Sequence, residues 1–194
     1  WSYEIPSRTI VLTFDDGPHP RHTPEVLAIL GEHGVVATFC VVGHMVEAQP
    51  DLVRRIAEEG HALCDHTTSH DMELRNRSAE RIQDEIAGTL AAITAAAPGA
   101  EVPFFRAPGG HFAENLNEVA TSLGQVPLGW SIDTRDWRQP GAADIRDRVL
   151  HEAHPGAVVL MHDGGGDRTG TVEALPGIIS GLADLGYEFV VPAS

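Results

Sequence analysis

Apolar residues along this chain form two alternating patterns, short continuous runs and longer segments with helical spacing. A nearly continuous apolar run is typical of a parallel strand covered on both faces, and seven runs fit that description. The segments between them carry apolar residues three and four positions apart, as helices packed on a sheet do. Strands are expected at Thr9–Phe14, Val35–Val42, His61–Asp65, Pro103–Arg106, Val126–Ile132, Ala157–Met161 and Tyr187–Val191.

The helical segments are bounded by residues that favour helix ends. Thr23 and Pro24 resemble an N-cap and a first helical position, and Gly34 stands where that helix would close. The expected helices are Glu25–His33, a segment from Pro50 to Gly60, a segment from Ser78 to Pro98, Asn115–Leu123, Ala142–Glu152 and Val172–Leu185.

Strands and helices alternate along the whole sequence. Such alternation implies right-handed crossovers and a parallel sheet. No linker, repeat or low-complexity stretch interrupts the 194 residues, so we expect one α/β domain over residues 1–194. At this point, both an open doubly wound sheet and a closed or nearly closed barrel fit the strand count.

Charge and hydropathy exclude some partners. The formal net charge is −15, and no cluster of basic residues provides a footprint for nucleic acid or an anionic membrane. No apolar run approaches the roughly 18 residues that suggest a transmembrane helix. Because the chain opens at Trp1 without an initiator Met, we interpret it as a trimmed or recombinant domain. We expect a monomer.

The two cysteines, Cys40 and Cys64, admit three interpretations. They are buried free thiols, or they form a disulfide worth roughly 3 kcal/mol in the chain-entropy model. Cys64 is also close enough to His66 in sequence to serve as a metal ligand.

Residues with reactive side chains follow the predicted strands at their carboxyl ends. In parallel α/β folds this end carries the ligand site. Contributions from five different strands favour a barrel mouth over a crevice at one switch point. The residues are Asp15 and Asp16 after the first strand, His66 and His70 after the third, Arg106 ending the fourth, Asp133 after the fifth and His162 after the sixth.

Two pairs within this set indicate a metal. Asp15 and Asp16 leave their strand in different directions, so one carboxylate can bind a metal while the other handles a proton. A plain Asp-Gly-Pro turn is the alternative. On a helical turn, His66 and His70 at i, i+4 would share one face, although such a pair is often incidental. Together with Asp16 they make a two-histidine, one-carboxylate set, which suits a hydrolytic Zn²⁺ site or a non-haem Fe(II) site.

Five motifs then resemble those of the polysaccharide deacetylases of carbohydrate esterase family 4, which include chitin, peptidoglycan and acetylxylan deacetylases. They occur in the family's order and extend the similarity from Thr13 to about Val191. The resemblance implies a distorted, incomplete (β/α) barrel of about seven parallel strands. The motifs are TFDDGP at Thr13–Pro18, HTTSH at His66–His70, RAPGG at Arg106–Gly110, DTRDW at Asp133–Trp137 and LMH at Leu160–His162.

The resemblance assigns roles to the reactive residues. It implies one divalent metal ion, zinc by preference with cobalt or nickel as substitutes, held by Asp16, His66 and His70. Water activated by that ion attacks the acetyl carbonyl, with Asp15 as general base and His162 as general acid.

Residues around these groups are given supporting roles. Arg106 is expected to orient Asp15, and Asp133 to lie beside His162 and raise its pKa. The backbone N–H of Gly109 would stabilise the oxyanion. Trp137 and Leu160 resemble the residues that line the family's acetyl-methyl pocket.

The third motif departs from the commonest pattern. A Tyr often follows its Pro, whereas Gly109 and Gly110 follow Pro108 here. The change keeps a backbone donor but removes an aromatic wall of the sugar groove, which His111 and Phe112 are expected to replace in part. We interpret His19, His22 and His44 as solvated or capping residues.

The expected function is removal of N-acetyl groups from β-1,4-linked N-acetylglucosamine, in chitin oligomers or peptidoglycan, by a secreted or cell-wall-associated enzyme. The alternative on the same site is an esterase for O-acetyl groups of xylan. A catalytically dead binding module would have lost at least one of five side chains, and all five are present in this sequence: Asp15, Asp16, His66, His70 and His162. An Fe(II) oxygenase would need oxygen and a co-substrate.

Overall fold

The first strand lies at the centre of the fold, and the computed structural model describes residues 8–193. β1 (Thr9–Asp15) is buried along its whole length and pairs in parallel with β7 (Ala157–His162) on one side. On its other side its carboxyl half pairs with β2 (Thr38–Val41) and its first two residues pair with β8 (Glu188–Phe189). The ends of the expected domain, residues 1–7 and 194, lie outside the described residues.

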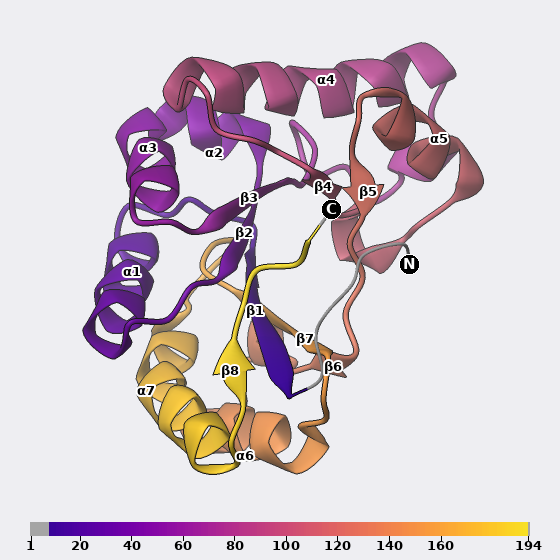
Figure 1. Ribbon diagram of the computed structural model, residues 1–194. Coiled ribbons are helices and arrows are strands. Elements are labelled where there is room, and N and C mark those ends of the chain that lie inside the picture. Colours follow the sequence, from indigo (N-terminus) through magenta and orange to yellow (C-terminus); the bar gives the residue numbers. More distant parts are fainter. Residues whose placement is uncertain (1–7, 194) are drawn as a thin grey trace.

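All recorded strand pairs are parallel, and the order along the sheet is β5-β4-β3-β2-β1-β7-β6. β5 and β6 end this path without pairing to each other, so the sheet curls into a barrel that does not close (Figure 1). The expected incomplete (β/α) barrel is confirmed. The remaining strands are β3 (Ala62–Asp65), β4 (Phe104–Phe105), β5 (Val126–Pro127) and β6 (Ile132–Asp133).

One predicted strand is divided in two. The apolar run 126–132 contains β5 (Val126–Pro127) and the first residue of β6 (Ile132–Asp133), separated by residues 128–131. Within that interval the carbonyls of Leu128 and Gly129 accept hydrogen bonds from the Arg106 side chain. Apolar character alone does not reveal this side-chain contact, so the prediction of a single strand was wrong.

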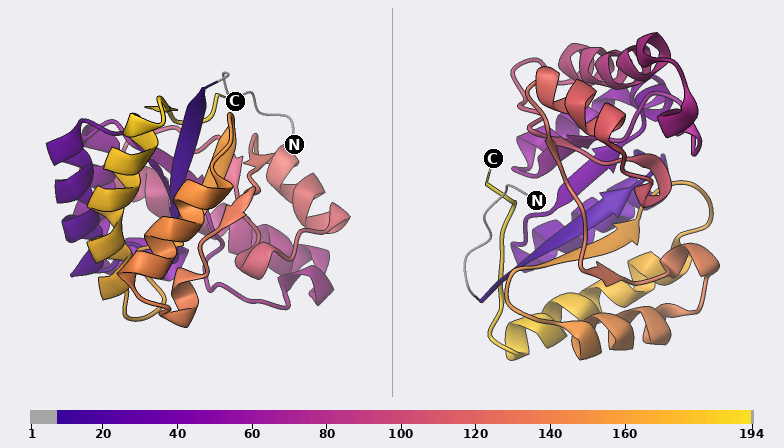
Figure 2. Two further views of the ribbon diagram at one scale, coloured as in Figure 1. Left: turned by 90° about the horizontal axis from the view of Figure 1, so that it is seen from below. Right: turned by 90° about the vertical axis from the view of Figure 1, so that its right-hand side faces the viewer.

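The helices lie around the outer face of the strands (Figures 1 and 2). Gly34 closes the first helix in a left-handed conformation, as predicted. That helix begins at His22, so the predicted N-cap Thr23 lies inside it, and the Thr23 hydroxyl donates to Asp163. The short α2 was not predicted. The helices are α1 (His22–His33), α2 (Gly43–Ala48), α3 (Pro50–Glu58), α4 (Ala79–Ala96), α5 (Glu114–Ser122), α6 (Ala142–Glu152) and α7 (Thr169–Asp184).

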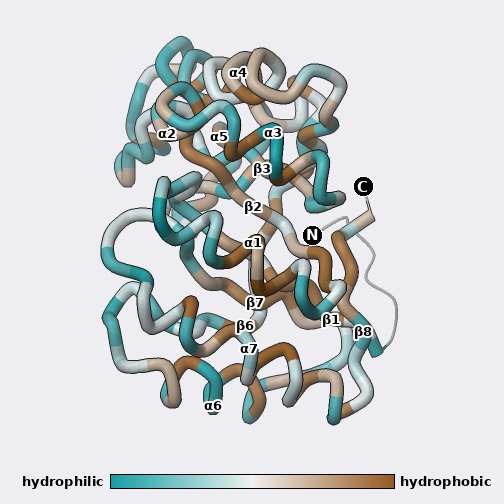
Figure 3. Tube along the Cα trace, turned by 90° about the vertical axis from the view of Figure 1, so that its left-hand side faces the viewer, coloured by the Kyte–Doolittle hydropathy of each residue, from teal (hydrophilic) through white to brown (hydrophobic). Residues whose placement is uncertain are grey.

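Strand alternation separates two interiors. Ile10, Leu12 and Phe14 on β1 pack outward into the main core with the helices, and the intervening residues therefore face the barrel interior. Hydrophobic residues accordingly gather along the strands, brown in Figure 3. Cys40 and Cys64 are register partners on β2 and β3 and are buried free thiols. Within residues 8–193, no helix is long and apolar enough to cross a membrane.

Candidate active site and metal centre

The two adjacent aspartates diverge at the carboxyl end of β1. Asp15 is the last residue of the strand and faces the barrel interior, whereas Asp16 adopts φ +71° and turns away. The loop after β7 covers Asp16 closely: a Cβ on Gly165 would collide with the Asp16 carboxylate, and one on Gly164 with the Asp16 backbone. Only glycine permits this approach, so the loop shields one side of the Asp16 side chain.

Arg106 anchors Asp15 inside the barrel. Its Nη1 atom donates to Asp15 Oδ1 at 2.6 Å, and both side chains are almost wholly buried. The same nitrogen donates to the Thr13 hydroxyl at 2.8 Å. Burial opposes the guanidinium charge, but the neighbouring Asp15 outweighs it and raises the pKa of Arg106. The expected orientation of Asp15 by Arg106 is therefore present in the geometry.

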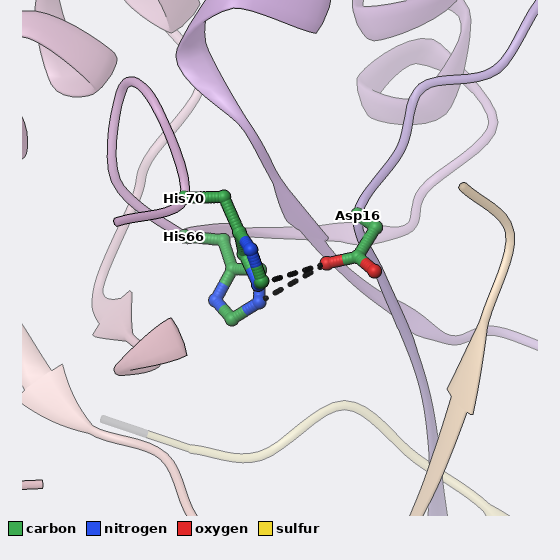
Figure 4. Close-up of side chains that lie close together, drawn as sticks. All are labelled: Asp16, His66 and His70. Carbon is green, nitrogen blue, oxygen red and sulfur yellow. Dashed lines mark ion pairs between the residues drawn. The ribbon is translucent and has the colours of Figure 1, made fainter. Parts of the chain in front are cut away.

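The two histidines converge on Asp16, although the loop that carries them is not helical. Thr67 and His70 have φ of +68° and +55°, so the expectation of a helical turn is wrong. His66 Nε2 lies 3.4 Å from Asp16 Oδ1, and His70 Nε2 lies 3.2 Å from the same atom (Figure 4). The loop brings the two rings together by its left-handed residues instead of by helical spacing.

The donor set fits a divalent cation. One ligand atom from each of Asp16, His66 and His70 lies within 4.8 Å of the other two. Asp16 Oδ1 is buried without a hydrogen-bond partner, which is costly for a carboxylate oxygen unless a cation compensates it. His66 Nδ1 donates to the Arg106 carbonyl at 2.8 Å, which in the neutral ring directs the Nε2 lone pair toward Asp16. Two imidazoles and one carboxylate suit Zn²⁺ or Fe(II).

The electrostatics of the cluster also favour positive charge. Burial alone would raise the pKa of Asp16, but His66, His162 and His70 outweigh it and hold that pKa low. Burial likewise disfavours a charged His66, but Asp15 and Asp16 raise its pKa. Burial and the neighbouring His66 lower the pKa of His70. Two carboxylates that stabilise a proton on a buried imidazole would also stabilise a metal ion at the same place.

His162 lies beside Asp15, and its partner differs from the predicted one. The two are register partners on β7 and β1, so their side chains share the barrel face. His162 Nδ1 donates to Asp136 Oδ1 at 2.7 Å. Burial opposes the charged imidazole, but Asp136 raises the pKa of His162. Asp133 instead accepts the N–H of Arg135, so its expected contact with His162 is wrong.

Asp136 is the carboxylate beside His162 that sequence reasoning missed. Its Oδ2 accepts the backbone N–H of His162 and the Thr171 hydroxyl, both at 2.8 Å. Arg135, in a left-handed conformation with φ +55°, precedes a short 3₁₀ turn that carries Asp136. A signal was available, because Asp136 is the other carboxylate of the DTRDW motif.

The remaining predicted site residues lie around this centre. Within residues 8–193, no acceptor is recorded for the Gly109 N–H, and a Cβ on Gly109 would collide with the Met72 thioether. Leu160 is buried as the register partner of Thr13. Trp137 is 48% exposed, and the Arg138 guanidinium stacks on its ring.

The histidines and aromatic residues outside the candidate metal centre differ in their contacts and burial. His111 Nδ1 contacts the Met72 carbonyl and Phe112 packs on a core cluster, while Trp130 stands against Gly110. His19 caps α1 by accepting two backbone N–H groups, as predicted. His22 is buried, so the interpretation of it as a solvated residue is wrong, and its Nε2 atom accepts the Arg168 N–H. His44 is exposed.

Known proteins resemble this chain over nearly its whole length. A family model described as polysaccharide deacetylase matches residues 2–128. A chitooligosaccharide deacetylase of Rhizobium leguminosarum bv. trifolii is 44% identical over 191 residues, covering 93% of this chain and 88% of the relative. A peptidoglycan-N-acetylglucosamine deacetylase of Bacillus cereus is 37% identical over 193 residues, covering 97% and 89%. The crystal structure of a peptidoglycan N-acetylglucosamine deacetylase superposes with a TM-score of 0.91 at 36% identity, covering 97% of this chain and 87% of that chain. The chain belongs to the polysaccharide deacetylase family.

Proposed function

We propose that this protein is a zinc-dependent deacetylase that hydrolyses N-acetyl groups on β-1,4-linked N-acetylglucosamine chains. The observation that carries the proposal is the unpartnered Asp16 Oδ1 atom, buried and facing the Nε2 atoms of His66 and His70. Hydrolysis is favoured over Fe(II) oxygenase chemistry because the chain belongs to a hydrolase family.

The residues around this donor set divide the proton transfers. A divalent ion supplies an activated water molecule and polarises a carbonyl oxygen. Asp15 Oδ1 is held by Arg106, which leaves Oδ2, 3.6 Å from His66 Nε2, to accept the proton of the attacking water. The carboxylate thus borders the ligand set without joining it.

His162 is the proposed general acid. Asp136 holds its Nδ1 proton and raises its pKa, so the ring stays protonated at higher pH and can donate from Nε2 to the leaving nitrogen. Asp15 and His162 are register partners on neighbouring strands, so the proposed base and the proposed acid would act on one scissile bond from the same face of the barrel.

Backbone and apolar groups complete the proposed site. The Gly109 N–H, which has no recorded acceptor within residues 8–193, is the candidate donor to the oxyanion. Leu160 lies two residues before His162 on the same face of β7, and with Trp137 it is the proposed wall for the acetyl methyl group.

The relatives support N-acetylated glycans as substrates. The chitooligosaccharide and peptidoglycan deacetylases each match more than nine-tenths of this chain. Both of those names denote amide hydrolysis on N-acetylglucosamine polymers or oligomers. Substrates of this kind also fit a secreted or cell-wall-associated protein.

The test is acetate release from chitooligosaccharides, peptidoglycan fragments and acetylxylan by the zinc-reconstituted protein. We expect acetate release from at least one of the N-acetylated glycans. The release should stop on chelation and return with Zn²⁺ or Co²⁺. It should be the same with and without oxygen, because hydrolysis, unlike oxygenase chemistry, consumes none. Release from acetylxylan alone would contradict the N-acetyl assignment. Activity that survives complete chelation would contradict metal dependence.

A further inference from the structure

The segment between the two candidate metal-ligand histidines is held by more contacts than a surface turn requires. Thr67 and His70 adopt left-handed backbone conformations, which residues other than glycine rarely do. Such a backbone persists only where its surroundings determine it. Many of the determining contacts come from α2 and α4, on the outer side of the sheet.

Thr68 occupies a slot between these two helices. A Cβ on Gly43 of α2 or on Gly88 of α4 would collide with Thr68. The first two N–H groups of α2 donate to the carbonyls of Thr67 and Thr68, each at 3.0 Å. The Thr68 N–H and hydroxyl both donate to the Glu85 carbonyl, at 3.0 and 2.9 Å. The middle of the loop is therefore clamped by backbone contacts on both sides.

The Glu85 side chain fixes the next residue, immediately before His70. Its Oε2 atom accepts the Ser69 N–H at 2.8 Å, and its Oε1 atom accepts the Ser69 hydroxyl at 2.7 Å. Glu85 is only 1% exposed, and Arg81 on the same helix supplies a compensating charge. Since an unpaired buried carboxylate is costly, a glutamate at this place needs the partners that it has.

His70 needs such support more than His66 does. The His66 ring is 2% exposed and is also fixed through Nδ1 by the Arg106 carbonyl. The His70 side chain is 31% exposed, and its N–H donates to the Thr67 hydroxyl at 3.2 Å. The direction of its Nε2 therefore depends largely on the backbone that Ser69 and Thr67 hold.

We infer that Glu85 is a positioning residue of the metal centre, which aims His70 at Asp16 by holding Ser69 through two hydrogen bonds. This inference rests on the proposed metal site. Outside its own helix, Glu85 makes hydrogen bonds to Thr68 and Ser69 and, within residues 8–193, to none of the three candidate metal ligands, so it acts through the loop. Loss of the Glu85 carboxylate should make the His70 side chain less well positioned and should lower the affinity for the metal more than it changes substrate binding.

The test compares Glu85→Gln, which keeps the shape and one acceptor oxygen, with Ser69→Ala, which removes only the hydroxyl bond. Asp84→Asn is the matched control, because Asp84 is the neighbouring, exposed carboxylate on the same helix. Zn²⁺ affinity is measured on the full chain by competition with a chromogenic chelator. The melting temperature of each metal-free protein and the kcat and KM of each zinc-saturated protein are measured in parallel.

We expect Glu85→Gln to bind Zn²⁺ at least about tenfold more weakly, within the range typical for partners that orient metal ligands. The Zn²⁺ affinity of Ser69→Ala should fall less, and that of Asp84→Asn should not change. In zinc-saturated Glu85→Gln, kcat should fall by a larger factor than KM changes. Zn²⁺ affinity within twofold of the wild type in Glu85→Gln overturns the inference, even if the metal-free protein melts earlier. If Glu85→Gln does not fold, wild-type affinity in Ser69→Ala overturns it. Failure of the wild-type chain to bind Zn²⁺ contradicts the proposed function itself.

Discussion

Replacing Arg106 by Met is the most informative single perturbation of the barrel interior. The guanidinium is fully buried and donates four hydrogen bonds, to Asp15 Oδ1, the Thr13 hydroxyl and the carbonyls of Leu128 and Gly129. Met approximates the length of the side chain but supplies no donor. The change therefore leaves one buried carboxylate without its charge partner and two carbonyls without donors.

The expected cost follows from the ion pair. Removing one partner of a buried pair typically costs about 3–5 kcal/mol, because the other charge stays buried. That is a large part of the roughly 5–15 kcal/mol by which a domain is usually stable. Adding Asp15→Asn removes the stranded charge, so the double variant should recover about 1–3 kcal/mol relative to Arg106→Met.

The assay is urea unfolding of the metal-free proteins, followed by circular dichroism, for the wild type, both single variants and the double variant. The slopes with denaturant must agree before the free energies of unfolding are compared. A loss below about 1 kcal/mol in Arg106→Met would refute the assignment of a buried, compensated pair. Absence of any recovery in the double variant would refute the role of the Asp15 charge.

Two further predictions concern His162. Because Asp136 raises the pKa of His162, Asp136→Asn should lower it, and the alkaline limb of the kcat/KM profile should move to lower pH. Asp133→Asn is the control and should leave that limb in place; a shift in both variants, or in neither, would contradict the pairing. His162→Ala should reduce amide hydrolysis by about 10²–10⁴-fold. It should reduce hydrolysis of an activated acetate ester far less, since a good leaving group needs no acid, and equal losses would argue against the acid role.

The sequence was sufficient to predict the barrel and the end of the strands where the candidate site residues gather. Apolar runs located the strands, and the residues after them, including Asp15 and His66, do lie at the carboxyl ends. Asp16, His66 and His70 do come together as the motifs implied. Strand ends of a parallel sheet share one edge, so this part of the arrangement follows from topology.

What the sequence could not supply depends on backbone torsions and long-range contacts. Left-handed residues at Thr67 and Arg135 set the directions of the histidine loop and of Asp136, and neither is a glycine that would signal the turn. The break between β5 and β6 depends on Arg106, more than 20 residues away in sequence. Glu85 does have a signal in the sequence, because it is a carboxylate at a helix position that is buried together with Ile82, Ile86 and Ile93.

The division of labour between the adjacent aspartates is tested most directly by measuring bound Zn²⁺ and acetate release together in Asp15→Asn and Asp16→Asn. Asp16 Oδ1 faces both histidines, whereas Asp15 is held by Arg106 at the edge of the set. We predict that Asp15→Asn keeps the metal but loses at least about 10²-fold in turnover, and that Asp16→Asn loses both. Near-normal turnover in Asp15→Asn, or full zinc retention in Asp16→Asn, would contradict the account.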